Sequence, residues 1–401
     1  MGIAGGTGPL SRRRLLRASA AAAALGGIGV AGCSRDGDTG AVVTPPPGPT
    51  PKPAVPTPQS LPARTQYTFP PAAEPLAKDL QAAGLPIVYG PNSVPAPTGI
   101  SAPAQQAWAN NSQMPLPADD PVKLAAVRQF GSRNDEIERG RISQTHTLQD
   151  RTLNGITTLW ITPREVRHPD KLMVFIHGGA WIINSRFAQL SLQCALADNL
   201  GVKVASLEYR LAPEHPYPAA LDDINTAYTE ILKEYHPENL GLFGTSAGGG
   251  LTLATLLRLR ATGLALPAAA AALCPGADMT HSGYLFSAVG LNDPILSPRD
   301  IDLCMRAYVS GADPTDPLVS PVFGDYRGIP PLFILATTAE IIGSDGIRVA
   351  DTARSQGVDV TLLVNDGMWH VPIADGTGIP ELQRAFDQLV DFFRRQMRIP
   401  T

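Results

Sequence analysis

The feature that most constrains the fold is an alternation of short apolar runs with longer amphipathic stretches, which begins near residue 142. The runs at 171–176, 269–274 and 331–337 are apolar almost throughout, which is typical of strands buried on both faces of a parallel sheet. The stretches between such runs carry apolar residues at helical spacing. Strands that alternate with helices predict a doubly wound α/β domain.

The whole pattern predicts a mainly parallel eight-stranded sheet with helices on both faces. The strands are expected at 142–149, 153–162, 171–176, 203–209, 240–245, 269–274, 331–337 and 358–364. The helices are expected at 186–200, 218–235, 247–262, 343–356 and 381–397. Segments 104–140 and 276–325 do not fit the alternation, although 298–310 is helix-like. We expect both segments to form a cap over the carboxyl ends of the strands, where open α/β sheets bind ligands.

The first hundred residues differ from the rest in composition. The chain holds 39 prolines, and eight of them lie in the 14 residues 45–58. Proline fixes φ and lacks an amide proton, so such a run enters neither a helix nor a sheet ladder. We therefore expect 33–103 to be an extended, disordered spacer and 104–401 to be the folded domain.

A basic segment at 11–17 precedes the uncharged, apolar stretch Ala18 to Gly32. This stretch is too short to span a bilayer core of about 30 Å, and the order of the two segments is that of a secretory signal. Its Ser-Arg-Arg-x-Leu-Leu pattern resembles the twin-arginine export signal. An ordinary basic region of the general secretory route is the alternative. We expect 1–32 to be an export signal.

The apolar stretch ends in Val30-Ala31-Gly32-Cys33, which resembles a bacterial lipobox. In such a motif the cysteine becomes the lipidated first residue of the mature protein, and several acyl chains anchor it firmly in a membrane. We expect an exported protein of the cell envelope, held to a membrane through Cys33. The alternative is that Cys33 merely follows a plain signal peptide.

Charge and cysteine usage give no support for a nucleic-acid-binding protein or for a protein with a cysteine-ligated metal. A net charge of −4 gives no reason to expect a nucleic-acid partner. Besides Cys33 the chain has Cys194, Cys274 and Cys304, an odd number with no metal-ligand spacing such as CxxC. We expect buried free thiols and no metal or organic cofactor. A disulfide between Cys274 and Cys304 stays open as an alternative.

The segment Gly244-Thr245-Ser246-Ala247-Gly248 has the G-x-S-x-G form. It follows an apolar predicted strand and precedes a predicted helix, which is the context of a nucleophile elbow. Small flanking residues permit the tight turn, and the Ser246 hydroxyl is then held clear of the sheet. A strand-to-helix turn in which Ser246 only caps the helix is the alternative.

A second signal, His177-Gly178-Gly179-Ala180-Trp181, follows the predicted strand 171–176 and lies 69 residues before the serine. Small residues there let backbone amides face a developing oxyanion. Together with the amide of Ala247, these amides predict an oxyanion hole. His177 is expected to orient the loop rather than to transfer protons.

A serine nucleophile requires a base and an acid, which follow it in the order acid, then histidine, in enzymes with this elbow. His370 follows the last predicted strand, whereas His281 leaves almost no room for an intervening acid. Glu340 lies just beyond the predicted strand 331–337 and 30 residues before His370. The favoured base is His370 and the favoured acid is Glu340, with Asp345 as the alternative acid.

These motifs, with several others, make the chain similar to the bacterial hormone-sensitive-lipase family of esterases, in its GTSAG branch. The similarity covers about 120–397. The shared motifs are HGGAW (177–181), EYRLAPEHPYPAALDD (208–223), GTSAGG (244–249), DPILS (293–297), DPTDPLVSPVF (313–323) and GVDVTLLVNDGMWHV (357–371).

The resemblance implies an α/β-hydrolase fold and a serine carboxylesterase that acts on short to medium acyl esters without a cofactor. The residues carried over are the nucleophile Ser246, the base His370, the acid Glu340 and the oxyanion amides of Gly178, Gly179 and Ala247, with Ala180 close by. The family more often has HGGG, so Ala180 replaces a glycine and its Cβ narrows the acyl site.

Three aromatic residues, Trp181, Phe286 and Trp369, are candidate walls of the substrate pocket, and core packing is the alternative for each. A lipase or an amidase would use the same catalytic groups as an esterase. A hydrolase fold that only binds its ligand is a further alternative, but such proteins usually lack a member of the triad.

Overall fold

A single eight-stranded sheet organises the part of the protein that the computed structural model describes, residues 94–400 apart from 112, 114, 376 and 377. The expected export signal, the Cys33 lipid site and most of the expected spacer lie outside the described residues. Within the described residues, none of the helices combines the length and the apolar character needed to cross a bilayer.

The strands follow the spatial order β1-β2-β4-β3-β5-β6-β7-β8. Their bounds are β1 Thr147–Leu153, β2 Ile156–Thr162, β3 Leu172–Ile176, β4 Lys203–Leu207, β5 Leu240–Thr245, β6 Ala269–Leu273, β7 Leu332–Thr337 and β8 Val360–Asn365. β1 and β2, and β2 and β4, pair antiparallel, whereas every other pair is parallel. The mainly parallel eight-stranded sheet expected from the sequence is confirmed.

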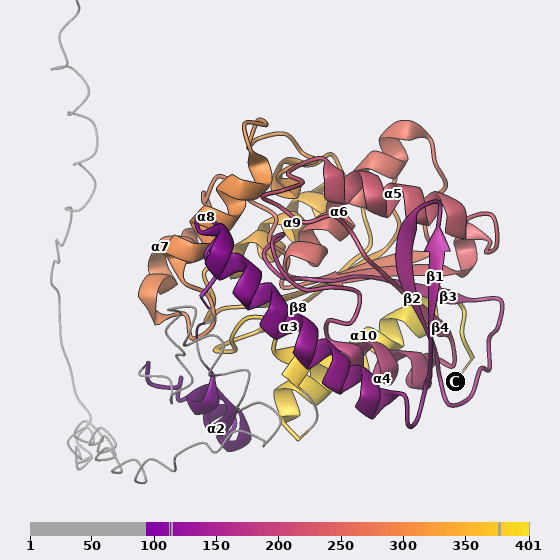
Figure 1. Ribbon diagram of the computed structural model, residues 1–401, viewed down its shortest axis with the longest axis horizontal. Coiled ribbons are helices and arrows are strands. Elements are labelled where there is room, and N and C mark those ends of the chain that lie inside the picture. Colours follow the sequence, from indigo (N-terminus) through magenta and orange to yellow (C-terminus); the bar gives the residue numbers. More distant parts are fainter. Residues whose placement is uncertain (1–93, 112, 114, 376–377, 401) are drawn as a thin grey trace, which may run out of the picture. The chain divides into compact units, whose positions relative to one another are not determined.

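Helices cover both faces of this sheet (Figure 1). α5 (Ala219–Ile231), α6 (Ala247–Thr262) and α9 (Gly343–Ser355) pack on one face, and α4 (Leu190–Leu200) and α10 (Pro380–Gln396) pack on the other. Alternate strand residues supply the two cores, since Val174 joins the first apolar cluster and its neighbour Phe175 joins the second. Burial on both faces explains why these strands are continuous apolar runs.

The segments expected to form a cap are helical. The N-terminal segment forms α2 (Ala102–Asn110) and α3 (Pro121–Ile142), and the insertion after β6 forms α7 (Tyr284–Val289) and α8 (Pro298–Val309). Hydrogen bonds join the two segments: the Gln113 side chain donates to the Asp293 carbonyl at 2.7 Å, and the Leu116 amide donates to the Asp300 carboxylate at 3.2 Å.

The first predicted strand, 142–149, is wrong in its first half. Ile142 is the last residue of α3, and β1 begins only at Thr147. β1 is an edge strand with polar residues on a largely exposed surface, so its sequence lacks the apolar pattern that marks the other strands. A stronger signal is the Asn154-Gly155 pair, which occupies the hairpin turn with φ of 46° and 89°.

The described cysteines Cys194, Cys274 and Cys304 are all buried and free. The expectation of buried thiols is therefore confirmed, and the alternative of a Cys274–Cys304 disulfide is wrong. Burial raises the pKa of the Cys194 thiol to about 12. Free cysteines are among the residues most often buried, and these three follow that tendency.

We predict that Gly248→Ala lowers the free energy of unfolding by about 3 kcal/mol, because overpacking at a rigid contact is costly. A Cβ at this position of α6 would lie 2.1 Å from the Ile176 carbonyl oxygen and 2.4 Å from that of His177, and both are backbone atoms of the neighbouring strand and loop. Urea denaturation measures the change.

The matched control is Gly131→Ala, in α3, where an added Cβ meets nothing within 4 Å. This variant should gain up to about 1 kcal/mol from helix propensity. Equal effects of the two substitutions would contradict the close approach of α6 to the end of β3.

Candidate active site

Ser246 lies in a strained turn between β5 and α6. Its backbone angles, φ of 56° and ψ of −124°, fall outside the regions that residues with a side chain ordinarily adopt. Backbone hydrogen bonds hold the turn, since the Ser246 amide donates to the Leu273 carbonyl at 2.8 Å and its carbonyl accepts from the amides of Gly250 and Gly276. The side chain makes no capping hydrogen bond, so the alternative of a simple helix cap is wrong. The hydroxyl is left available for another partner.

That partner is His370, which lies in the loop after β8. Its Nε2 is 2.8 Å from the Ser246 Oγ. The Nδ1 of the same ring is hydrogen-bonded to the carboxylate of Glu340, in the turn after β7. The hydroxyl, the imidazole and the carboxylate thus form a continuous chain of hydrogen bonds between residues that follow three different strands.

The two alternatives for base and acid lie elsewhere. His281 pairs with Asp302 of α8 at 3.1 Å through its Nε2. Asp345, near the start of α9, accepts the amides of Ala277 and Asp278 at 2.9 and 3.0 Å. Burial raises the pKa of Asp345 well above its ordinary range. Asp345 therefore holds the backbone that follows β6, and Glu340 is the carboxylate that contacts His370.

The glycines after β3 lie directly beside Ser246. A Cβ on Gly178 would be 2.8 Å from the Thr245 carbonyl oxygen and 3.1 Å from the Ser246 Cβ. Gly179 adopts a backbone φ of +121°, which residues with a side chain rarely adopt. Among the hydrogen bonds of the described residues, none has the amide of Gly178, Gly179 or Ala247 as its donor. Because these amides lie beside Ser246 and donate to no other group of the described residues, they are free to stabilise an oxyanion.

His177, which precedes these glycines, is fully buried and stacks on Tyr209 with ring centroids 4.1 Å apart. Its Nδ1 is bonded to the Gly178 carbonyl at 2.8 Å, and the Tyr209 hydroxyl donates to the His177 carbonyl at 2.8 Å. Burial lowers the pKa of His177 and keeps the ring neutral. These contacts fit a residue that orients the loop.

An arginine of the cap fixes the continuation of this loop. Arg128 of α3 donates to the Ile182 carbonyl at 2.7 Å and to the Ala212 carbonyl at 2.8 Å. It also forms a two-point contact with Glu214. One planar guanidinium thus joins the loop after β3 to the loop after β4. Neither Arg128 nor its role has a local signal in the sequence.

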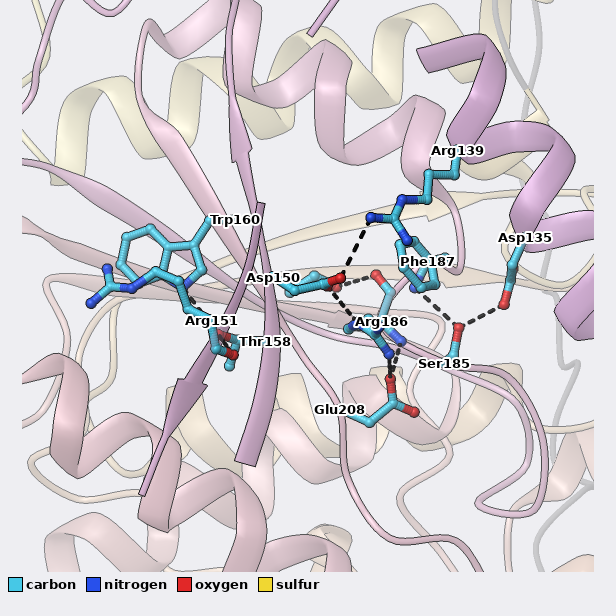
Figure 2. Close-up of polar contacts among 11 residues, drawn as sticks. Asp135, Arg139, Asp150, Arg151, Thr158, Trp160, Ser185, Arg186, Phe187 and Glu208 are labelled. Carbon is cyan, nitrogen blue, oxygen red and sulfur yellow. Dashed lines mark hydrogen bonds and ion pairs between the residues drawn. The ribbon is translucent and has the colours of Figure 1, made fainter. Parts of the chain in front are cut away.

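Figure 2 shows a second group of polar contacts on the same loop. Arg186 pairs with Asp150 of β1 at 3.0 Å and with Glu208 at 2.9 Å, and the Ser185 hydroxyl donates to Asp135 of α3 at 2.6 Å. The loop that carries the glycines is therefore tied to the edge of the sheet and to the cap.

Asp293, from the DPILS motif of the insertion, is fully buried next to the turn that carries Glu340. Its carboxylate accepts the amides of Ile295, Leu296 and Ile341, each at 2.8 Å. Burial raises the pKa of Asp293 to about 6. Since Ile341 adjoins Glu340, this carboxylate fixes the backbone of the acid turn to the insertion.

The three aromatic candidates for the pocket differ in their packing. Trp369 is fully buried and packs edge-on against Trp108, which favours core packing for this residue. Trp181 is also buried, stacked on Tyr308 with centroids 5.1 Å apart. Phe286 is partly buried and contacts the His281 ring. The role of Trp181 and Phe286 as pocket walls stays a prediction.

A possible ligand set for a metal coincides with the catalytic group. In the described part of the chain, Cys274, Glu340 and His370 place ligand atoms within 4.8 Å of one another. Both ring nitrogens of His370 are already hydrogen-bonded, to Ser246 and to Glu340. Burial raises the pKa of the Cys274 thiol well above its ordinary value, so the thiol is protonated. The cluster is best described as a hydrogen-bonded group.

Comparison with known proteins identifies the family of this chain. A family model described as alpha/beta hydrolase fold matches residues 173–374. An acetyl-hydrolase of Streptomyces hygroscopicus is 32% identical over 275 residues, which are 66% of this chain and 91% of that protein.

Solved structures extend the comparison. A crystal structure of an esterase has a TM-score of 0.68 and 30% identity, and the match covers 78% of this chain and 98% of that one. A second, described as an esterase from the bacterial hormone-sensitive lipase family, has a TM-score of 0.64 and 26% identity, over 82% of this chain and all of that one.

We predict that a fluorophosphonate probe labels Ser246 covalently, because the histidine beside the hydroxyl accepts its proton during attack at phosphorus. Ser246→Ala should abolish labelling, and His370→Asn should slow it by at least about 100-fold. Mass spectrometry of the modified peptide identifies the site. Ser191→Ala, at an exposed serine of α4, is the control and should label normally. Labelling that survives Ser246→Ala would contradict the assignment.

Proposed function

The chain belongs to the α/β-hydrolase family and is a carboxylester hydrolase, and from this premise we propose that it is a serine esterase whose triad is Ser246, His370 and Glu340. The observation that carries the proposal is the chain of hydrogen bonds from the Ser246 hydroxyl through the His370 ring to the Glu340 carboxylate. We also propose that it belongs to the GTSAG branch of the hormone-sensitive-lipase family, which the motifs HGGAW and GTSAGG support.

In the first step, the Ser246 oxygen attacks the ester carbonyl while the His370 Nε2 takes the hydroxyl proton. The 2.8 Å separation of these two atoms allows direct transfer. Glu340 accepts a hydrogen bond from the opposite side of the ring. It holds the tautomer with a free Nε2 and stabilises the imidazolium that forms.

The negative charge that develops on the carbonyl oxygen is stabilised by the amides of Gly178, Gly179 and Ala247, with Ala180 next in the loop. Loss of one donor in such a site typically raises the barrier by about 3–4 kcal/mol. The imidazolium then protonates the departing alcohol, and an acyl group remains on Ser246.

In the second half of the reaction, His370 removes a proton from a water molecule that attacks the acyl-enzyme. The tetrahedral intermediate collapses, the Ser246 oxygen regains its proton from the imidazolium, and the carboxylic acid leaves. Besides the ester and the water molecule, the steps use only the side chains and backbone amides named here.

We assign short to medium acyl esters as the substrates. Ala180 stands where the family more often has glycine, and we infer that its added methyl group narrows the acyl site. The similar Streptomyces protein is named an acetyl-hydrolase. A lipase or an amidase would share the triad, and rates on long-chain esters and on amides separate these activities.

We further propose an exported, membrane-anchored enzyme, with a twin-arginine signal at 1–32 and a lipid on Cys33. The basic segment, the short apolar stretch and the small residues before Cys33 support this assignment. The proline-rich segment behind Cys33 would hold the catalytic domain away from the membrane surface.

We predict that Glu340→Gln lowers kcat by about 10³- to 10⁴-fold, because the amide no longer selects the tautomer with a free Nε2. Asp345→Asn, the matched control, should leave kcat within about threefold of the wild type. Hydrolysis of p-nitrophenyl esters from acetate to palmitate measures both effects, and the wild type should prefer acetate or butyrate. Activity lost in Asp345→Asn but kept in Glu340→Gln would overturn the assignment of the acid.

A separate prediction concerns the anchor. Cys33→Ala should move the protein from the membrane fraction to the soluble fraction of envelope preparations, since the acyl chains can no longer be attached. Ser34→Ala, at the adjacent position, should remain in the membrane fraction. Immunoblots of fractionated cells measure the partition, and a membrane-bound Cys33→Ala protein would contradict lipidation.

A further inference from the structure

The carboxylate of Glu340 is completely buried. Within the described residues, Glu340 forms its ion pair with His370, which is charged only during part of the reaction. Burial of a carboxylate is unfavourable unless hydrogen bonds replace its water shell. The groups around this carboxylate therefore determine where it points.

The Thr337 hydroxyl supplies one such hydrogen bond. Thr337 is the last residue of β7, is fully buried, and donates to Oε1 of Glu340. The other carboxylate oxygen, Oε2, faces the His370 Nδ1. Each oxygen thus has its own partner, and the two partners together define the plane of the carboxylate.

Cys274 lies behind this hydroxyl, directly after β6, the strand adjacent to β7. Its Sγ is 4.0 Å from the Thr337 Oγ1, within the range of a sulfur hydrogen bond. The Cys274 backbone is unusual for a residue with a side chain, with φ of 47°, and its amide is bound to the Leu335 carbonyl of β7 at 2.7 Å. The Thr337 hydroxyl donates its proton to Glu340, and the Cys274 thiol lies against both the hydroxyl and the carboxylate.

We propose that Thr337 is a positioning residue of the esterase reaction: its hydroxyl, backed by the Cys274 thiol, fixes the Glu340 carboxylate so that Oε2 meets His370. The proposal rests on the triad named above and extends it by two buried side chains: the Thr337 hydroxyl, and the Cys274 thiol, which contacts both that hydroxyl and the Glu340 carboxylate. Neither Thr337 nor Cys274 reaches the substrate, and both act through the orientation of Glu340.

Loss of the hydroxyl leaves Oε1 without its Thr337 partner in a buried site, and the carboxylate then rotates away from the His370 ring. Hydrogen bonds to charged groups are strong enough that this loss corresponds to about 10- to 100-fold in rate. The ester itself binds through other groups. The effect should therefore appear in kcat, with KM within about twofold of the wild type.

The test compares Thr337→Val, which keeps the shape but removes the hydroxyl, with Thr337→Ser, which keeps the hydroxyl. We expect kcat for p-nitrophenyl butyrate to fall 10- to 100-fold in the first variant and to stay within about threefold in the second. Thr255→Val is the matched control, because Thr255 is also fully buried but its Oγ1 has no hydrogen-bond partner in the described structure. This control should show wild-type kcat.

A double variant separates a positioning role from a purely structural one. In the Glu340→Gln background, Thr337→Val should lower kcat little further, since the group through which Thr337 acts is already gone. Rates are divided by the concentration of sites titrated with a fluorophosphonate, so a partly unfolded variant is still informative. Effects that multiply in the double variant, or an unchanged kcat in Thr337→Val alone, would overturn the proposal.

The two proposals fail in different ways. If Glu340→Gln keeps wild-type activity, the triad itself is wrong. If Glu340→Gln is inactive and Thr337→Val is fully active, the triad stands and only the positioning role is wrong. Cys274→Ala should lower kcat by a smaller factor than Thr337→Val, because a thiol is a weaker hydrogen-bond donor than a hydroxyl.

Discussion

The close approach of α6 to the end of β3 is the contact on which the rest of the site depends. Gly248 lies so near the carbonyls of Ile176 and His177 that no side chain fits between them. This contact brings the turn at Ser246 against the glycines after β3, so the proposed nucleophile and the proposed oxyanion amides share one small space. The strain stored in the Ser246 backbone is held by hydrogen bonds to the neighbouring strand.

The cap and the sheet edge keep the surrounding loops in place through buried or partly buried polar contacts. Arg128 joins the loops after β3 and β4, and Asp293 joins the insertion to the turn that carries Glu340. Both contacts reach backbone carbonyls or amides, which fixes the path of the chain rather than a single side chain. The cap is thus part of the scaffold of the catalytic centre.

Sequence reasoning located the groups whose signal is local. The elbow at Ser246 and the glycines at 178–179 are recognisable because their turns require small residues. Thr337 carries no such signal: it ends an apolar strand, where threonine is common, and its role depends on Glu340 three residues later. Trp369 carries no decisive local signal either, since an aromatic residue next to His370 suits both a pocket wall and a core.

The amino-acid sequence by itself determined the class of fold, the order of the elements and the turn that carries the proposed nucleophile, because hydrophobic periodicity and tight turns are encoded by residues close together in the chain. Only the tertiary structure decided between Glu340 and Asp345, removed His281 from the site and placed Cys274 behind Thr337. These outcomes depend on which strand ends become neighbours, and sheet order is set by packing over the whole domain rather than by any local pattern.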